Sequence, residues 1–127
     1  MIVDSSAIVA IAFGEPDQQR LLRALAAASR VRVAAPTWLE TSIVLARLGD
    51  RAAPILDGIS RQFDFEIIPF DAEHAGVALA AWRQFGRGQH PAALNFGDCV
   101  SYAAARIADE PLLFVGDVFG RTDITAA

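Results

Sequence analysis

The chain has 127 residues, of which 54% are apolar, and this composition favours a single folded domain spanning residues 1–127 and argues against disorder. Its formal net charge of −4 excludes a general attraction to nucleic acid or anionic membranes, so a polyanion would have to be bound by a local patch or through metal ions. All 11 basic residues are arginine, which excludes any mechanism that needs a catalytic lysine.

Short strand-like runs alternate with helical runs along the chain. We predict strands at Met1–Val3, Val31–Val33, Phe65–Ile68 and Leu112–Val115, and a short final strand at Thr122–Thr125. We predict helices at Ser6–Phe13, Asp17–Ala28, Pro36–Leu48, Arg51–Gln62, Asp71–Phe85 and Asn95–Ala108. Pro36 suits a first helical turn, and Asp71 suits an N-cap. The alternation predicts an α/β fold with a central parallel sheet and helices on both faces.

Four acidic residues should meet at the edge where the parallel strands end, which is where open α/β sheets bind ligands. Asp4 follows the first strand, Asp117 follows the Leu112 strand, and Glu40 lies near the start of the helix after the second strand. Asp98 lies at the start of a helix that must run antiparallel to the strands, which brings its N-terminus to the same edge. The topology therefore predicts one acidic rim.

Each of these acids also has a purely structural explanation. Asp4 can be a helix N-cap, Glu40 a solvated helix residue and Asp117 a turn residue. Asp98 can form a capping box with Asn95. Taken together, however, four like charges at one rim repel and need a compensating cation, and no arginine adjoins them in the sequence. Oxygen ligands without histidine or cysteine favour Mg²⁺, with Mn²⁺ as a substitute.

The stretches MIVDSSAIVA, PTWLETSIVLAR, ALNFGDCVSYAAA and LLFVGDVFGRTDI, in this order, resemble PIN-domain ribonucleases of the VapC toxin type. The resemblance covers essentially the whole chain. It implies a three-layer α/β/α sandwich and a Mg²⁺-dependent endoribonuclease that acts as the toxin of a toxin–antitoxin pair. It also implies a homodimer and a cognate antitoxin whose C-terminal segment covers the active site.

The same resemblance assigns roles to individual residues. It implies that Asp4, Glu40, Asp98 and Asp117 form the acidic cluster that holds Mg²⁺, and that Ser6 and Asn95 line the site in supporting or substrate-contacting positions.

We expect Asp4 and Asp98 to bind the metal directly, and Glu40 and Asp117 to act through water or a second ion. Relatives often carry a second acid directly after the position of Asp117, where this chain has Val118, so the number of catalytic metals stays open. Asp123 is predicted to be structural.

The segment WRQFGRGQHP supplies Arg83 and Arg87 just before the Asn95 helix. Arginine suits bidentate phosphate contacts, so both are candidates for binding an RNA substrate with an exposed loop. They could equally be solvated charges at a helix end. Cys99, the only cysteine, is predicted to be a core or interface residue, and a chain without disulfide or apolar spanning stretch is expected in the cytoplasm.

Two other functions remain open from the sequence. A PIN-like protein could serve only as a binding or regulatory partner, with little or no turnover. A metal-dependent adhesion module with the pattern D-x-S-x-S would use Asp4 and Ser6, but Ile8 stands where its second serine is needed.

Overall fold

The computed structural model describes residues 1–127 and contains a central sheet of four short parallel strands in the order β3-β2-β1-β4. The strands are β1 (Ile2–Val3), β2 (Val31–Ala34), β3 (Phe65–Ile68) and β4 (Leu112–Leu113). Within the sheet, Ile2 lies opposite Arg32 of β2 on one side and opposite Leu112 of β4 on the other. β1 is therefore one of the two inner strands, and it delivers Asp4 to the carboxyl edge of the sheet.

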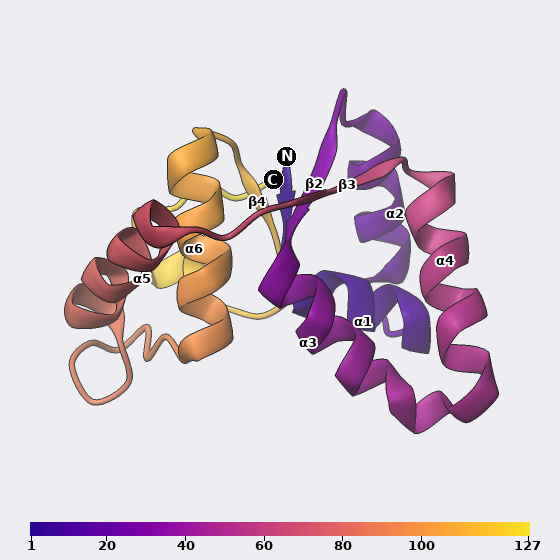
Figure 1. The fold of residues 1–127 in the computed structure, drawn as a ribbon, viewed down its shortest axis with the longest axis horizontal. Helices are drawn as coiled ribbons and strands as arrows, with labels where there is room; N and C mark the ends of the chain where they lie inside the picture. Colours follow the sequence, from indigo (N-terminus) through magenta and orange to yellow (C-terminus); the bar gives the residue numbers. More distant parts are fainter.

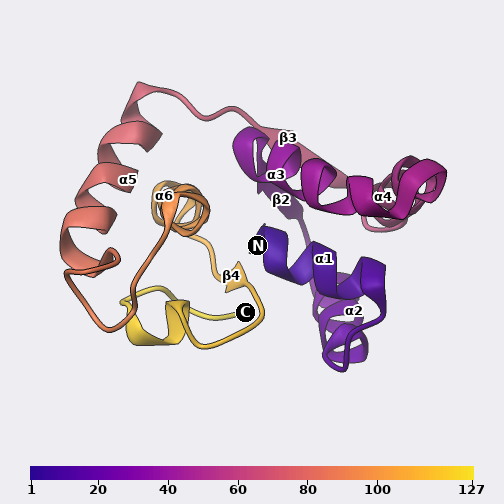
Figure 2. The ribbon, with the colours of Figure 1, turned by 90° about the horizontal axis from the view of Figure 1, so that it is seen from below.

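Helices cover both faces of this sheet (Figures 1 and 2). They are α1 (Ser5–Phe13), α2 (Gln18–Ala27), α3 (Ala35–Leu45), α4 (Ala52–Gln62), α5 (Ala72–Phe85) and α6 (Phe96–Ala108). Successive residues of a strand face opposite sides, so Ile2 packs into a core with α5 and α6, whereas Val3 packs into a second core with α1 and α2. The predicted α/β/α sandwich is confirmed.

The predicted helix at Pro36–Leu48 is wrong at its end. The α-helix stops at Leu45 and continues as a 3₁₀ segment over Ala46–Arg51. Gly49 has a φ of 58° within this segment, a backbone conformation that glycine adopts readily and that turns the chain into α4.

The predicted final strand at Thr122–Thr125 is also wrong. Phe119–Arg121 forms a 3₁₀ turn, and the chain rejoins the sheet only through an isolated bridge between Ala126 and Leu112. β4 ends at Leu113, before the predicted Val115, because the Val115 N–H donates to the Ser6 hydroxyl (3.1 Å) instead of continuing the strand ladder.

Polar side chains set the starts of three helices as the sequence predicts. Asp4 caps α1, Asp71 caps α5, and Asn95 caps α6. Each side chain satisfies a backbone N–H that has no partner within its own helix. None of the helices combines the length and the hydropathy that a membrane-spanning helix requires.

An ion-pair cluster ties the strands together at the opposite, amino edge of the sheet. The Met1 ammonium donates to Glu110 Oε2 (2.6 Å), and Arg32 Nη2 lies 2.6 Å from Glu110 Oε1. Hydrogen bonds from the N-terminus and Arg32 lower the pKa of Glu110, although partial burial opposes the shift. This cluster links β1, β2 and the segment that leads into β4, far from the acidic rim.

Candidate active site

Asp4 lies at the end of β1 and is only 4% exposed. Its carboxylate accepts three hydrogen bonds: from the Ser6 backbone N–H (3.0 Å) and Ser6 Oγ (2.6 Å) on Oδ2, and from Ser101 Oγ (2.6 Å) on Oδ1. The N-cap explanation of Asp4 is therefore correct, and the side chain is held in one orientation at the carboxyl edge of the sheet. Ser6 supports Asp4 directly.

Ser101 is the part of this site that the sequence did not reveal. It is 1% exposed on α6, donates to Asp4, and its Oγ lies 3.3 Å from Thr37 Oγ1 of α3. The available signal was its spacing, because Ser101 is three residues after Asp98 and therefore lies on the same face of α6.

Glu40 projects from α3 toward the start of α6. A Cβ atom built on Gly97 would lie 2.7 Å from Glu40 Oε2, so the carboxylate lies directly against the first turn of α6. Burial, followed by the negative charges of Asp4 and Asp98, raises the pKa of Glu40, and a hydrogen bond from the Ser5 side chain opposes the rise. Glu40 is thus electrostatically coupled to both Asp4 and Asp98.

Asp98 forms a capping box with Asn95. The Asn95 N–H donates to Asp98 Oδ2 (2.8 Å), and the Asp98 N–H donates to Asn95 Oδ1 (2.9 Å). Burial and the charge of Asp4 raise the pKa of Asp98, whereas the Asn95 hydrogen bond and the Arg87 charge lower it. The capping box leaves Oδ1 of Asp98 free and fixes the carboxylate beside Asp4.

Asp117 does not join these three acids. Its side chain is 75% exposed and pairs with Arg121 Nη2, four residues later. The structure contains no group of three or more His, Cys, Asp or Glu side chains placed closely enough to hold a metal ion. No arginine adjoins these acids in the sequence, but the fold brings two arginines close to them: Arg121 pairs with Asp117, and Arg87 lies near Asp98.

The remaining residues singled out in the sequence have clear places. Asp123 accepts a hydrogen bond from Tyr102 (2.7 Å) and lies 3.7 Å from Arg106, which agrees with a structural role.

Cys99 is buried in the core of α5 and α6, where burial, reinforced by the charge of Asp98, raises the pKa of its thiol to about 11. Cys99 is therefore a core thiol, as predicted. Arg83 lies in the last turn of α5 and makes no ion pair.

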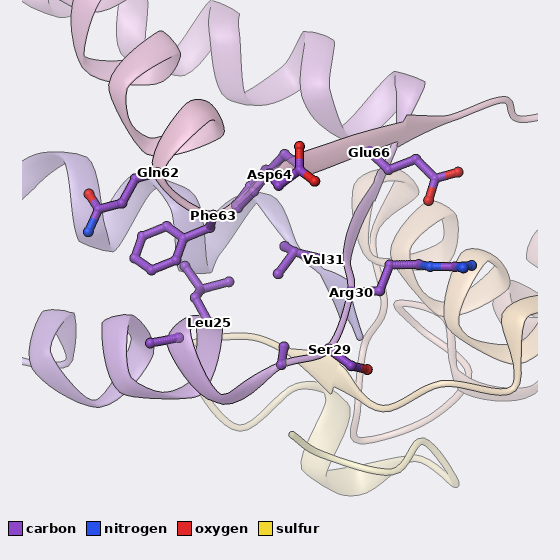
Figure 3. Close-up of a pocket in the computed structure, with 11 residues that line it drawn as sticks. Leu25, Ser29, Arg30, Val31, Gln62, Phe63, Asp64 and Glu66 are labelled. Carbon is purple, nitrogen blue, oxygen red and sulfur yellow. The ribbon is translucent and has the colours of Figure 1, made fainter.

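A cavity of about 840 Å³ lies away from these acids, near the amino ends of β2 and β3. Figure 3 shows Leu25, Val31 and Phe63 grouped in this cavity, with Arg30 and Glu66 extending away from them. It holds none of the rim acids and is not part of the candidate active site.

An apolar surface adjoins the rim on its other side. Five exposed side chains from α3, α5 and α6 form what we call the Phe96 face: Leu39, Ile43, Leu79, Trp82 and Phe96. Phe96 is 81% exposed and lies between two mainly apolar grooves of about 370 and 430 Å³. The outward direction of the Phe96 side chain is thus a feature that the tertiary structure reveals.

Comparison with known proteins identifies the family. The PIN-domain family model matches residues 1–124. The chain is 39% identical over 127 residues to a VapC ribonuclease of Mycolicibacterium smegmatis, covering 99% of this chain and 98% of the relative. It is 44% identical over 126 residues to ribonuclease VapC36 of Mycobacterium tuberculosis, covering 98% and 91% of the two chains.

Solved structures share the fold at lower sequence identity. VapC20 of Mycobacterium tuberculosis, a sarcin–ricin-loop-cleaving toxin, matches with a TM-score of 0.79 and 19% identity over 99% of this chain and 97% of that chain. The VapBC2 complex of Rickettsia felis bound to a promoter DNA fragment matches with a TM-score of 0.77 and 15% identity over 98% and 94%. The chain therefore belongs to the PIN-domain family, in the branch that contains the VapC ribonucleases.

Proposed function

We propose that this protein is a Mg²⁺-dependent endoribonuclease that hydrolyses RNA phosphodiester bonds and acts as the toxin of a toxin–antitoxin pair. The observation that carries the proposal is the coupling of Asp4, Glu40 and Asp98 at the carboxyl edge of the sheet. Burial and mutual repulsion raise the pKa values of Glu40 and Asp98, so the arrangement favours a bound cation. The relatives named VapC ribonucleases, which match nearly the full chain, support the same activity.

The donor set fits Mg²⁺, or Mn²⁺ in its place, because every candidate ligand is a carboxylate oxygen. Mg²⁺ commonly keeps several waters and uses only one or two protein carboxylates, so it does not require a preformed group of three acids. We assign Asp4 and Asp98 as its ligands, since both have a free lone pair on Oδ1. Bound Mg²⁺ would lower the pKa of a coordinated water and offset charge on the phosphate.

The other acids contribute in different ways. Glu40 adjoins Asp4 and Asp98 and is suited to orient the attacking water or to receive its proton. Asp117 contributes only if its carboxylate leaves Arg121 and turns toward the other acids. We retain it as a ligand that acts through water or with a second ion. Asn95 holds Asp98 in place through the capping box.

We further propose that arginines beside the rim bind the RNA backbone. Arg87 is close enough to lower the pKa of Asp98, so a phosphate held by Arg87 would lie next to the acidic site. Arg83 lies in the last turn of α5, four residues before Arg87, and we assign it to the same phosphate-binding role. Unpaired RNA loops are the natural substrate for such a site, because their backbone and bases are accessible.

The partners of the protein follow from the same assignment. We propose that a cognate antitoxin covers the acidic site with its C-terminal segment. We also propose that the protein forms a homodimer through the Phe96 face, where the exposed Phe96 ring stands between two mainly apolar grooves. Five large apolar side chains of this face are between 43% and 81% exposed, so a partner seated on it would bury a contiguous apolar surface, as stable interfaces do at their centre.

The decisive test is cleavage of RNA by purified protein with Mg²⁺, with Mn²⁺ and with chelator. Asp98→Asn keeps an oxygen that can accept the Asn95 N–H but removes the charge, so it should stay folded and lose at least about 100-fold in cleavage rate. Asp57→Asn makes the same change on the exposed surface of α4 and should cleave like the wild type. Metal-independent cleavage, or full activity of folded Asp98→Asn, would refute the metal-dependent mechanism, and a folded wild-type protein that cleaves no RNA would favour a binding or regulatory role.

A further inference from the structure

A buried chain of hydroxyl groups runs beneath the acidic rim. Thr37, Ser101 and Asp4 are 1%, 1% and 4% exposed, and they come from α3, α6 and the end of β1. Thr37 Oγ1 lies 3.3 Å from Ser101 Oγ, and Ser101 Oγ lies 2.6 Å from Asp4 Oδ1. No buried side-chain polar atom of the molecule lacks a hydrogen-bond partner, so this network is fully satisfied.

The direction of these hydrogen bonds is fixed by the number of protons. A carboxylate can only accept, so Ser101 must donate its single hydroxyl proton to Asp4. Ser101 then has no proton left, and Thr37 must be the donor in the contact between the two hydroxyls. On the other side of the carboxylate, Ser6 likewise donates to Asp4 and accepts from the Val115 N–H (3.1 Å).

This arrangement determines what Asp4 can offer to a ligand. A carboxylate has about four lone-pair positions, and three donors use both positions of Oδ2 and one of Oδ1. One lone pair therefore remains, on Oδ1, next to the Ser101 hydroxyl. Asp4 can bind a cation through that single oxygen, and the Ser101 hydrogen bond sets the direction in which the free lone pair points.

The same chain also aligns the segments that carry the other acids. Thr37 is three residues before Glu40 on α3, and Ser101 is three residues after Asp98 on α6, so each hydroxyl lies about one helical turn below a rim acid. A shift of either helix relative to β1 would break a buried hydrogen bond, which is costly.

We propose that Ser101 is a positioning residue for the metal site: with Thr37 as its donor, it orients Asp4 Oδ1 toward the cation and holds α6 in register with β1. The inference rests on the proposed metal-dependent function and adds to it a hydroxyl that carries no ligand role of its own. Outer partners of metal ligands typically contribute about 10- to 100-fold to metal affinity.

Two measurements on the purified protein test this role. The first is the affinity for Mn²⁺, from a calorimetric titration, and the second is kcat and KM for RNA cleavage. Ser101→Ala should weaken Mn²⁺ binding by about 10- to 100-fold and lower kcat more than it changes KM. Thr37→Val removes only the donor to Ser101 and should weaken Mn²⁺ binding by a smaller factor, whereas Thr37→Ser, which keeps the hydroxyl, should resemble the wild type.

Thr41→Val is the matched control. Thr41 is equally buried one turn along α3, but its hydroxyl donates to the Thr37 carbonyl (2.8 Å) and does not reach Asp4. This variant should therefore bind Mn²⁺ within about 2-fold of the wild type, a difference too small for a lost supporting hydrogen bond.

Four outcomes decide the assignment. Wild-type affinity in folded Ser101→Ala, or equal weakening in Thr41→Val, would overturn the role of Ser101 and leave the nuclease intact. If Ser101→Ala fails to fold, unchanged Mn²⁺ binding in Thr37→Val has the same consequence. A wild-type protein that neither binds Mn²⁺ nor cleaves RNA would instead overturn the proposed function, and the role of Ser101 with it.

Discussion

Gly97→Ala should lower the rate of RNA cleavage without lowering the stability of the protein. Gly97 lies in the first turn of α6 with a helical backbone, so alanine fits the backbone without strain. The new Cβ would lie 2.7 Å from Glu40 Oε2 and 2.9 Å from Oε1, closer than side-chain atoms approach. Because these atoms are the far end of a flexible side chain, the Glu40 carboxylate should move and the helix should not.

The size of the effect follows from these contacts. Restoring ordinary contact requires the Glu40 oxygen to move from 2.7 Å to 3.4 Å or more from the new atom. A displacement approaching 1 Å at a reacting centre can lower turnover by roughly 100-fold, so we expect a 10- to 100-fold loss of RNA cleavage. Alanine also favours the helix by up to about 1 kcal/mol relative to glycine, so the free energy of unfolding should stay equal or rise.

Urea unfolding and RNA cleavage, measured on the same preparations, check both parts. Gly76→Ala in α5 is the matched control, since a Cβ there meets no atom within 4 Å and should raise stability without changing cleavage. Wild-type cleavage by Gly97→Ala would show that the position of Glu40 does not matter to the reaction. A large loss of stability would show that the Glu40 side chain cannot move aside.

Two further predictions concern stability and assembly. Glu110→Gln removes the charge that pairs with the Met1 ammonium and Arg32, and should cost about 1–2 kcal/mol of unfolding free energy at neutral pH. Folding lowers the pKa of Glu110 below its ordinary value of 4.5, so the difference in unfolding free energy between wild type and Glu110→Gln should be full above pH 4.5. It should fade as the pH falls through the pKa of Glu110 in the folded protein. A difference in urea unfolding that does not change with pH would contradict this. Phe96→Ser should convert the proposed homodimer to a monomer in analytical ultracentrifugation, whereas Phe13→Ser, at 38% exposure on α1, should not. A dimer retained by Phe96→Ser would place the interface elsewhere.

Local sequence signals predicted the elements whose information is contained in a few neighbouring residues. The capping residues Asp71 and Asn95 marked helix starts correctly, and the short stretch Phe65–Ile68 forms a strand with the predicted bounds. Errors occurred where a distant group competed with the local pattern. Val115 left the strand ladder for the Ser6 hydroxyl, a choice made by a residue 109 positions away.

The candidate site divides in the same way. Alternation of strands and helices was enough to bring Asp4, Glu40 and Asp98 to one edge, because all strands of a parallel sheet end there. It could not show that Asp117 pairs with Arg121, since the choice between a neighbour four residues away and a distant cluster depends on side-chain positions.

Ser101 and Phe96 mark what only the tertiary structure decided. Both lie on α6, and the sequence alone shows a serine and a phenylalanine on a helix in which most residues are apolar. Packing of α6 between β1, α3 and α5 turns the serine inward to a buried carboxylate and leaves the phenylalanine exposed. The sequence by itself determined which segments fold as strands and helices and which edge collects the acids, because those depend on local patterns and on strand direction. The direction in which each α6 side chain points was decided by the rotation of that helix against its neighbours, which is set by contacts across the whole chain.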